Sequence, residues 1–219
     1  MRERDFYIDC LRSVMIALVV LHHTALTYGA SGLWFYHELL PSPTPSSVIL
    51  TLFTATNQAY FMGLLFLLAG YFTPGSLERK GYAQFLGDRF LRLGLPLLAF
   101  GLILGPVTHA MVNAAEGKGL WSSFVFDNGP LWFNQALLMF SLTYCAWRAR
   151  FGSPLTGAQR APRPIPSYGW WLLSAFGVGA AALGIRQVVP VGVNVIGLQL
   201  GYFASYIFLF SLGIAGSGN

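Results

Sequence analysis

Apolar residues along this chain gather into six long runs that are separated by short polar or basic segments. The longest runs reach about 20 residues, which is enough to cross the hydrocarbon core of a bilayer. Each run is expected to be helical, because a spanning segment must satisfy its own backbone hydrogen bonds. The pattern therefore predicts an all-α, polytopic membrane helix bundle of about six transmembrane helices. The predicted spans are residues 8–28, 48–72, 93–113, 130–147, 170–184 and 194–213.

The basic residues are divided unequally between the two sides of this predicted bundle. Of the 13 Lys and Arg residues, Arg12 lies inside the first span, and only Lys118 and Arg186 lie in the segments that follow the third and fifth spans. The others lie before the first span or after the second and fourth spans, and they are Arg2, Arg4, Arg79, Lys80, Arg89, Arg92, Arg148, Arg150, Arg160 and Arg163. Cytoplasmic loops carry an excess of Lys and Arg. We therefore expect a multi-pass protein of the inner (plasma) membrane with a cytoplasmic N-terminus.

The composition agrees with a membrane protein and argues against two other classes. The mean hydropathy is +0.57, and charged residues make up 10% of the 219 residues, whereas a soluble domain has about 25%. The formal net charge of +5 could suggest a nucleic-acid-binding protein. However, the basic residues lie in short loops between apolar runs and not along one exposed face. We therefore expect the lipid bilayer as a partner and no nucleic acid.

Ionisable residues inside the first span are the first candidates for chemistry, because such groups are costly in a membrane and commonly functional. Arg12 and His23 are eleven residues apart. At 100° per residue this is about 20° more than three turns, so both lie on one helix face, about 16 Å apart along the axis. His22 is rotated about 80° away from that face. Asp9 precedes Arg12 by three residues and can pair with it on the same helix.

The depths of these side chains suggest how a ligand could lie. Arg12 is about one turn in from the cytoplasmic end, and His23 is about 22 Å deep, past the midplane of a roughly 30 Å core. A cation near the cytosol and an imidazole deeper on the same face suit an elongated anionic ligand that enters from the cytosol. The alternative is that Arg12 snorkels to the interface and that His23 lines a packed polar patch.

Two further spans contain polar residues with more than one interpretation. Arg89 and Arg92 lie three residues apart at the start of the third span, where two arginines can clamp phosphates or act as ordinary topology signals. His109 lies about 24 Å into the same span, close to the depth of His23, and two histidines at one depth could ligate a metal or haem. Asn57 in the second span is expected to join helices by hydrogen bonds.

Four stretches of the chain carry motifs that occur together in a known family. The stretches are YIDCLRSVMIALVVLHH, FMGLLFLLAGYFTP, FLGDRFLRLGLPLL and GPLWFNQALLMFSLTY. In this order they resemble the acyltransferase-3 family of membrane O-acyltransferases, from residue 7 to about residue 147. The family's Arg or Lys, followed after ten residues by His, corresponds to Arg12 and His23. Its Arg-x-x-Arg corresponds to Arg89 and Arg92.

The chain also departs from the family pattern. Ala69 stands where a serine commonly precedes the glycine of the second helix, and Pro130 stands where a histidine often precedes Leu-Trp-Phe. The family usually has about ten helices. We therefore expect residues 1–219 to be a single transmembrane domain that forms the N-terminal part of a larger acyltransferase domain.

The resemblance implies transfer of an acyl group from a cytosolic acyl-CoA, with acetyl-CoA as the expected donor, to a hydroxyl of a sugar or cell-envelope glycan. Arg89 and Arg92 would hold the CoA phosphates, and Arg12, steadied by Asp9, would bind the polar part of the donor further in. His23 would act as the general base on the acceptor hydroxyl or would form a transient acyl-histidine. The resemblance implies O-acetylation of a polysaccharide, without a metal or a permanently bound cofactor.

Two other classes of protein remain open on the sequence. Half-buried arginine and histidine also mark ion and proton paths, so a transporter or carrier for an anionic small molecule is the main alternative. Such a protein would more often have inverted repeats, and the sequence has no evident repeat. A bis-histidine haem protein that uses His23 and His109 is the third class. The acyl chain, the acceptor and the oligomeric state do not follow from the sequence.

Overall fold

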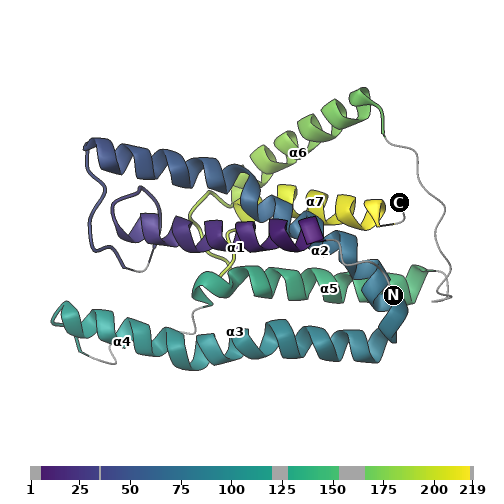
Figure 1. The fold of residues 1–219 in the computed structure, drawn as a ribbon, viewed down its shortest axis with the longest axis horizontal. Helices are drawn as coiled ribbons and strands as arrows, with labels where there is room; N and C mark the ends of the chain where they lie inside the picture. Colours follow the sequence, from purple (N-terminus) through teal and green to yellow (C-terminus); the bar gives the residue numbers. More distant parts are fainter. Residues whose placement is uncertain (1–5, 35, 120–127, 153–165, 218–219) are drawn as a thin grey trace. The chain divides into compact units, whose positions relative to one another are not determined.

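A computed structural model describes residues 6–34, 36–119, 128–152 and 166–217. Within these ranges the regular secondary structure is helical, which confirms the all-α part of the predicted fold class (Figure 1). The α-helices are α1 (Phe6–Thr27), α2 (Pro45–Arg89), α3 (Leu95–Ala99), α4 (Gly105–Ala115), α5 (Trp132–Phe151), α6 (Tyr168–Val188) and α7 (Phe203–Gly216). Each of the six predicted spans contains helix. Four arginines of the topology prediction lie outside the described residues, namely Arg2, Arg4, Arg160 and Arg163.

Three helical stretches are long and apolar enough to cross a membrane, and they support a membrane protein. They are Phe6–Thr27, Pro45–Ala115 and Tyr168–Val188. The apolar stretch Leu200–Gly216 is shorter. Helix α5 is long enough, with 20 residues, but Asn134, Gln135 and Arg148 lower its hydropathy. The predicted count of about six spans is therefore not confirmed.

The longest stretch is divided by a glycine. A straight helix of 71 residues would be about 106 Å long, far more than the roughly 30 Å of a bilayer core. At Gly81 the backbone leaves the helical region, with φ 71° and ψ 171°, a conformation that side-chain-bearing residues rarely adopt. The helix before Gly81 continues past the predicted end at residue 72 and through Pro74. There the Thr73 hydroxyl donates to the Ala69 carbonyl oxygen at 2.7 Å.

The helical run after Gly81 is interrupted by two wider turns. The π-helical segments η1 (Phe90–Gly94) and η2 (Phe100–Leu104) flank α3. Segments of this kind are rare and are frequently found at functional sites. Arg89 directly precedes η1, and Arg92 lies within it. A wider turn changes the angle between residues three apart, so the two arginines need not share the face expected from a regular α-helix.

The described part of the chain forms two compact units, residues 1–65 and 66–219, and each is considered by itself. In the first unit, α1 and the beginning of α2 enclose a small apolar cluster of Ala25, Leu26 and Ala30. The connecting loop is tied back to both helices. His37 Nδ1 donates to the Leu26 carbonyl oxygen at 2.9 Å, and the Ser31 N–H donates to Thr51 Oγ1 at 3.0 Å. The C-terminal end of α1 is therefore held in place by the loop.

The second unit has an aromatic core between α2, α5 and α7. Phe66 is fully buried, and its ring lies 4.8 Å from both Phe133 and Tyr206, between ring centroids. Beside it, α2 and α7 cross closely. A Cβ on Gly70 would lie 2.1 Å from the Phe210 carbonyl oxygen. Small residues commonly allow membrane helices to approach in this way.

Candidate functional site

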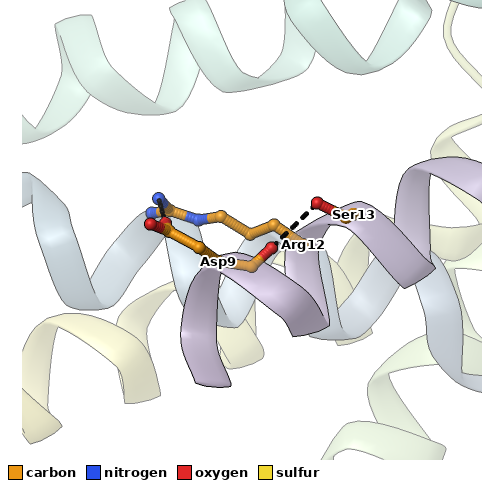
Figure 2. Close-up of polar contacts among 3 residues, drawn as sticks. All are labelled: Asp9, Arg12 and Ser13. Carbon is orange, nitrogen blue, oxygen red and sulfur yellow. Dashed lines mark hydrogen bonds and ion pairs between the residues drawn. The ribbon is translucent and has the colours of Figure 1, made fainter. Parts of the chain in front are cut away.

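The N-terminal part of α1 carries the expected ion pair. Arg12 Nη1 lies 3.7 Å from Asp9 Oδ1, and the Ser13 hydroxyl donates to the Asp9 carbonyl oxygen at 3.0 Å (Figure 2). Both charged side chains are about two-fifths exposed, at 41% and 40%. An ion pair this exposed contributes little to stability. Its main effect is therefore to orient the Arg12 guanidinium.

His23, eleven residues after Arg12 on α1, has one ring nitrogen engaged by the helix backbone. Its Nδ1 lies 2.8 Å from the Val19 carbonyl oxygen, one turn back in the helix. A carbonyl oxygen only accepts hydrogen bonds, so in the neutral ring the proton is on Nδ1, and Nε2 keeps its lone pair. The ring is half-buried, and its centroid lies 4.3 Å from the Trp34 ring centroid. The backbone of α1 thus leaves His23 Nε2 as a proton acceptor.

His22 has different surroundings, in agreement with the rotation expected from helical spacing. It is 8% exposed, and its ring stacks on Phe61 with centroids 5.2 Å apart and an interplanar angle of 23°. It also meets the edge of the His23 ring, with centroids 5.6 Å apart. The two neighbouring histidines therefore touch one another but face different neighbours.

Arg89 and Arg92 belong to the second unit, whereas Asp9, Arg12 and His23 belong to the first, and each set is described on its own. Arg89 Nη2 donates to Thr73 Oγ1 at 3.3 Å. Its guanidinium carbon also lies 4.9 Å from the centroid of the Phe85 ring.

The Arg92 side chain is exposed. Arg89, the last residue of α2, is half-buried and turned towards Thr73 in the earlier part of the same helix. The role of the two arginines as a phosphate clamp stays a prediction. Arg92 is the one that a dissolved anion would meet first.

Two charged residues on either side of Gly81 also pair with one another. Lys80 donates a hydrogen bond to Asp88, across the break at Gly81. This hydrogen bond, together with the nearby positive charges, holds the pKa of the Asp88 carboxyl below its usual value. The pair therefore links the two helical segments on either side of Gly81 while the carboxylate is ionised.

A buried ion pair was not expected from the sequence. Arg148, in the last turn of α5, has a side chain only 10% exposed, and its Nη2 lies 3.6 Å from Glu78 Oε1 on α2. Its Nε is buried and has no hydrogen-bond partner in the described part of the chain. In the sequence Arg148 is one of several basic residues at helix ends that are expected to be cytoplasmic. The signal that could have distinguished it is Glu78, an acidic residue expected on the same side of the membrane.

The described residues give little support for a metal centre. Within these ranges, no three His, Cys, Asp or Glu side chains are grouped as metal ligands would be. His109 lies on α4 in the second unit and His23 in the first. The two-histidine haem hypothesis therefore stays untested by the fold.

Comparison with known proteins gives one family and several relatives. The sequence profile of the family described as "Acyltransferase domain" (Acyl_transf_3) matches residues 5–217. The chain is 25% identical over 156 residues to "Glucans biosynthesis protein C" of Escherichia coli strains K12, SMS-3-5 / SECEC and O9:H4 HS. The aligned region covers 66% of this chain but only 39% of each relative's own length. No solved structure matches the chain. Because the family profile matches nearly all of its residues, the chain belongs to the acyltransferase-3 family.

Proposed function

We propose that this chain carries the donor-binding and catalytic residues of a membrane-embedded O-acyltransferase. The donor is a cytosolic acyl-CoA, and the acceptor is a hydroxyl of a sugar or cell-envelope glycan. Family membership supports acyl transfer, and the relatives' name, which refers to glucan biosynthesis, supports a glycan acceptor. The observation that carries the proposal is His23, because its Nδ1 is occupied by the Val19 carbonyl oxygen and its Nε2 is left to accept a proton.

In the proposed reaction, His23 Nε2 takes the proton of the acceptor hydroxyl while the hydroxyl oxygen attacks the carbonyl carbon of the thioester. The carbon–sulfur bond then breaks, and CoA leaves as a thiolate. The proton on His23 passes to this thiolate, so the products are an O-acyl ester and CoA thiol, and the imidazole returns to its neutral form. A thiolate is a good leaving group, so the chemistry needs a base more than an acid.

The donor would extend from the cytosolic surface along the face of α1. Arg92 and Arg89 bind the nucleotide phosphates by charge-assisted hydrogen bonds. Arg12, oriented by Asp9, binds the polar part of the pantetheine arm. About 16 Å of helix separates Arg12 from His23, so the extended arm can bring the thioester towards the imidazole. This arrangement requires a cytoplasmic N-terminus in the inner membrane.

A transfer assay tests the proposal. The purified chain in lipid nanodiscs is given acetyl-CoA labelled in the acetyl group together with a gluco-oligosaccharide, and the label is followed into the sugar. We expect an alkali-labile ester on the oligosaccharide and one CoA thiol for each ester formed. Label bound to the protein without acceptor would indicate the acyl-histidine route. If the chain binds no acyl-CoA and forms no ester, the proposed function is wrong.

A further inference from the structure

Two polar groups in the first unit are buried and unpaired. His22 is 8% exposed and Asn57 is 2% exposed. His22 Nδ1 and Asn57 Nδ2 have no hydrogen-bond partner among the described residues. Burying such a group without a partner costs several kcal/mol in an apolar environment, and a membrane span offers no bulk water to compensate. Two such groups in one unit therefore call for an explanation other than stability.

Phe61 of α2 relates the positions of the two groups. His22 on α1 stacks on Phe61 of α2. Asn57 lies four residues before Phe61, so it occupies the same face of α2, one turn away. His22 also contacts the His23 ring in a T-shaped arrangement. His22 is therefore adjacent to the proposed catalytic imidazole, and Asn57 lies one helical turn from the ring on which His22 stacks.

Asn57 does not join these helices in the way its position suggested. Its Oδ1 accepts a hydrogen bond from the Tyr60 hydroxyl at 3.3 Å, and Tyr60 belongs to the same helix. If the oxygen and nitrogen of the Asn57 amide were exchanged, the Tyr60 hydroxyl would accept a hydrogen bond from the amide instead of donating one. The other end of the amide would still be unpaired. An amide of this kind has a hydrogen-bonding group to offer to a ligand.

A hydroxyl is the ligand that fits both groups. A hydroxyl both donates and accepts hydrogen bonds. It can therefore accept a hydrogen bond from the Asn57 amide and donate one to an unprotonated nitrogen of the His22 imidazole. If that nitrogen is protonated, the hydroxyl accepts a hydrogen bond from it instead. Neither His22 nor Asn57 carries a fixed charge of the kind that selects phosphates. The chemistry therefore points to a neutral, hydroxyl-rich ligand such as a sugar rather than to the anionic end of the donor.

We propose that His22 and Asn57 form a hydroxyl-binding subsite that holds the acceptor next to His23. The subsite rests on the proposed transferase function and specifies which of its residues recognise the acceptor. The reacting hydroxyl, or a neighbouring one on the same sugar, takes the hydrogen bonds that the protein leaves unmade. His22 and Asn57 are positioning residues, and His23 alone moves the proton.

The test replaces each polar side chain by an apolar one of similar shape. The variants are Asn57→Leu and His22→Phe, and the second keeps an aromatic ring against Phe61. Gln58→Leu is the matched control, because this residue is the polar neighbour of Asn57 on the same helix. For each protein, the melting temperature without ligands, the Kd for acetyl-CoA, and kcat and KM for the gluco-oligosaccharide are measured.

For Asn57→Leu and His22→Phe, we expect the KM for the oligosaccharide to rise about three- to tenfold, the scale of one lost hydrogen bond. The Kd for acetyl-CoA should be unchanged. The melting temperature of Asn57→Leu should be equal to or above that of the wild type, because an unpaired polar group has been removed. The Gln58→Leu control should keep the KM of the wild type.

The outcomes separate this inference from the proposed function. If the wild type acylates the oligosaccharide and both variants keep its KM, the subsite is wrong and the transferase stands. If Asn57→Leu melts well below the wild type, Asn57 has a structural role and the subsite is also wrong. If the wild type itself transfers no acyl group, the glycan acceptor and the subsite are rejected together.

Discussion

The close crossing of α2 and α7 makes Gly213, like Gly70, a position where a single added methyl group forces the backbone to move. A Cβ on Gly213 would lie 2.1 Å from the Leu67 carbonyl oxygen and 2.7 Å from the Tyr71 backbone nitrogen. Both atoms belong to the backbone of α2 and cannot rotate away as a side chain would. Gly213→Ala therefore forces α7 away from α2.

The size of the effect follows from the distances. Real Cβ contacts essentially never fall under 3.0 Å, so α7 must move by about 1 Å. A shift of this size loosens the ring contacts that α7 makes through Tyr206 and Phe210 with the aromatic core. Forcing extra volume into a packed interior costs about 1–3 kcal/mol. The melting temperature should fall by several degrees for a chain of this length.

Thermal unfolding in detergent, followed by tryptophan fluorescence, measures the effect. The matched control is Gly179→Ala on α6, where an added Cβ meets nothing within 4 Å. Alanine is favoured over glycine inside a helix by about 1 kcal/mol, so the control should melt at or above the temperature of the wild type. If Gly213→Ala melts together with the control, α2 and α7 do not cross in this way.

Three further predictions concern the charged residues. Glu78→Gln removes the carboxylate charge that faces the largely buried Arg148 guanidinium and should destabilise the protein by about 1–3 kcal/mol, measured by the same melt, whereas an unchanged melting temperature would show that the two do not pair. Replacing Arg89 and Arg92 together by alanine should weaken acetyl-CoA binding at least tenfold, a loss that grows smaller at high salt, because hydrogen bonds to charged groups contribute about 1.5–3 kcal/mol each. Binding of acetyl-pantetheine, which lacks the nucleotide, should hardly change in a titration, and equal losses for both ligands would remove the phosphate clamp. Arg79→Cys, in a chain whose native cysteines are replaced, should react with a membrane-impermeant thiol reagent only after the cells are opened, and labelling in intact cells would reverse the topology.

The features that the sequence predicted well are those that depend on near neighbours or on the membrane itself. The helices appear in the predicted runs because a bilayer leaves an apolar backbone segment little alternative. The pair of Asp9 and Arg12 was predictable because residues three apart on a helix are adjacent. The different environments of His22 and His23 also follow from the angle between successive residues on a helix.

Other features depend on contacts that a linear pattern does not contain. The helix continues past the predicted end at residue 72 and through Pro74, and the Thr73 hydroxyl bonds back to the helix there. Arg92 lies within the wider turn η1, and Arg89, just before it, donates a hydrogen bond to Thr73. A regular helix would have placed both arginines on one face. Burial of Arg148 depends on its packing against α2, and a charge at a helix end gives no sign of that in the sequence.

His23 is the centre of the proposed mechanism, and its replacement tests that mechanism most directly. The measurement is the rate of acetyl transfer to a gluco-oligosaccharide by His23→Ala and by the wild type, at saturating acetyl-CoA and with the Kd for acetyl-CoA determined for both. Loss of a general base should lower the rate at least about 100-fold, while donor binding and the melting temperature stay close to those of the wild type. A His23→Ala protein that transfers acetyl groups at the wild-type rate would contradict the assignment of His23 as the base.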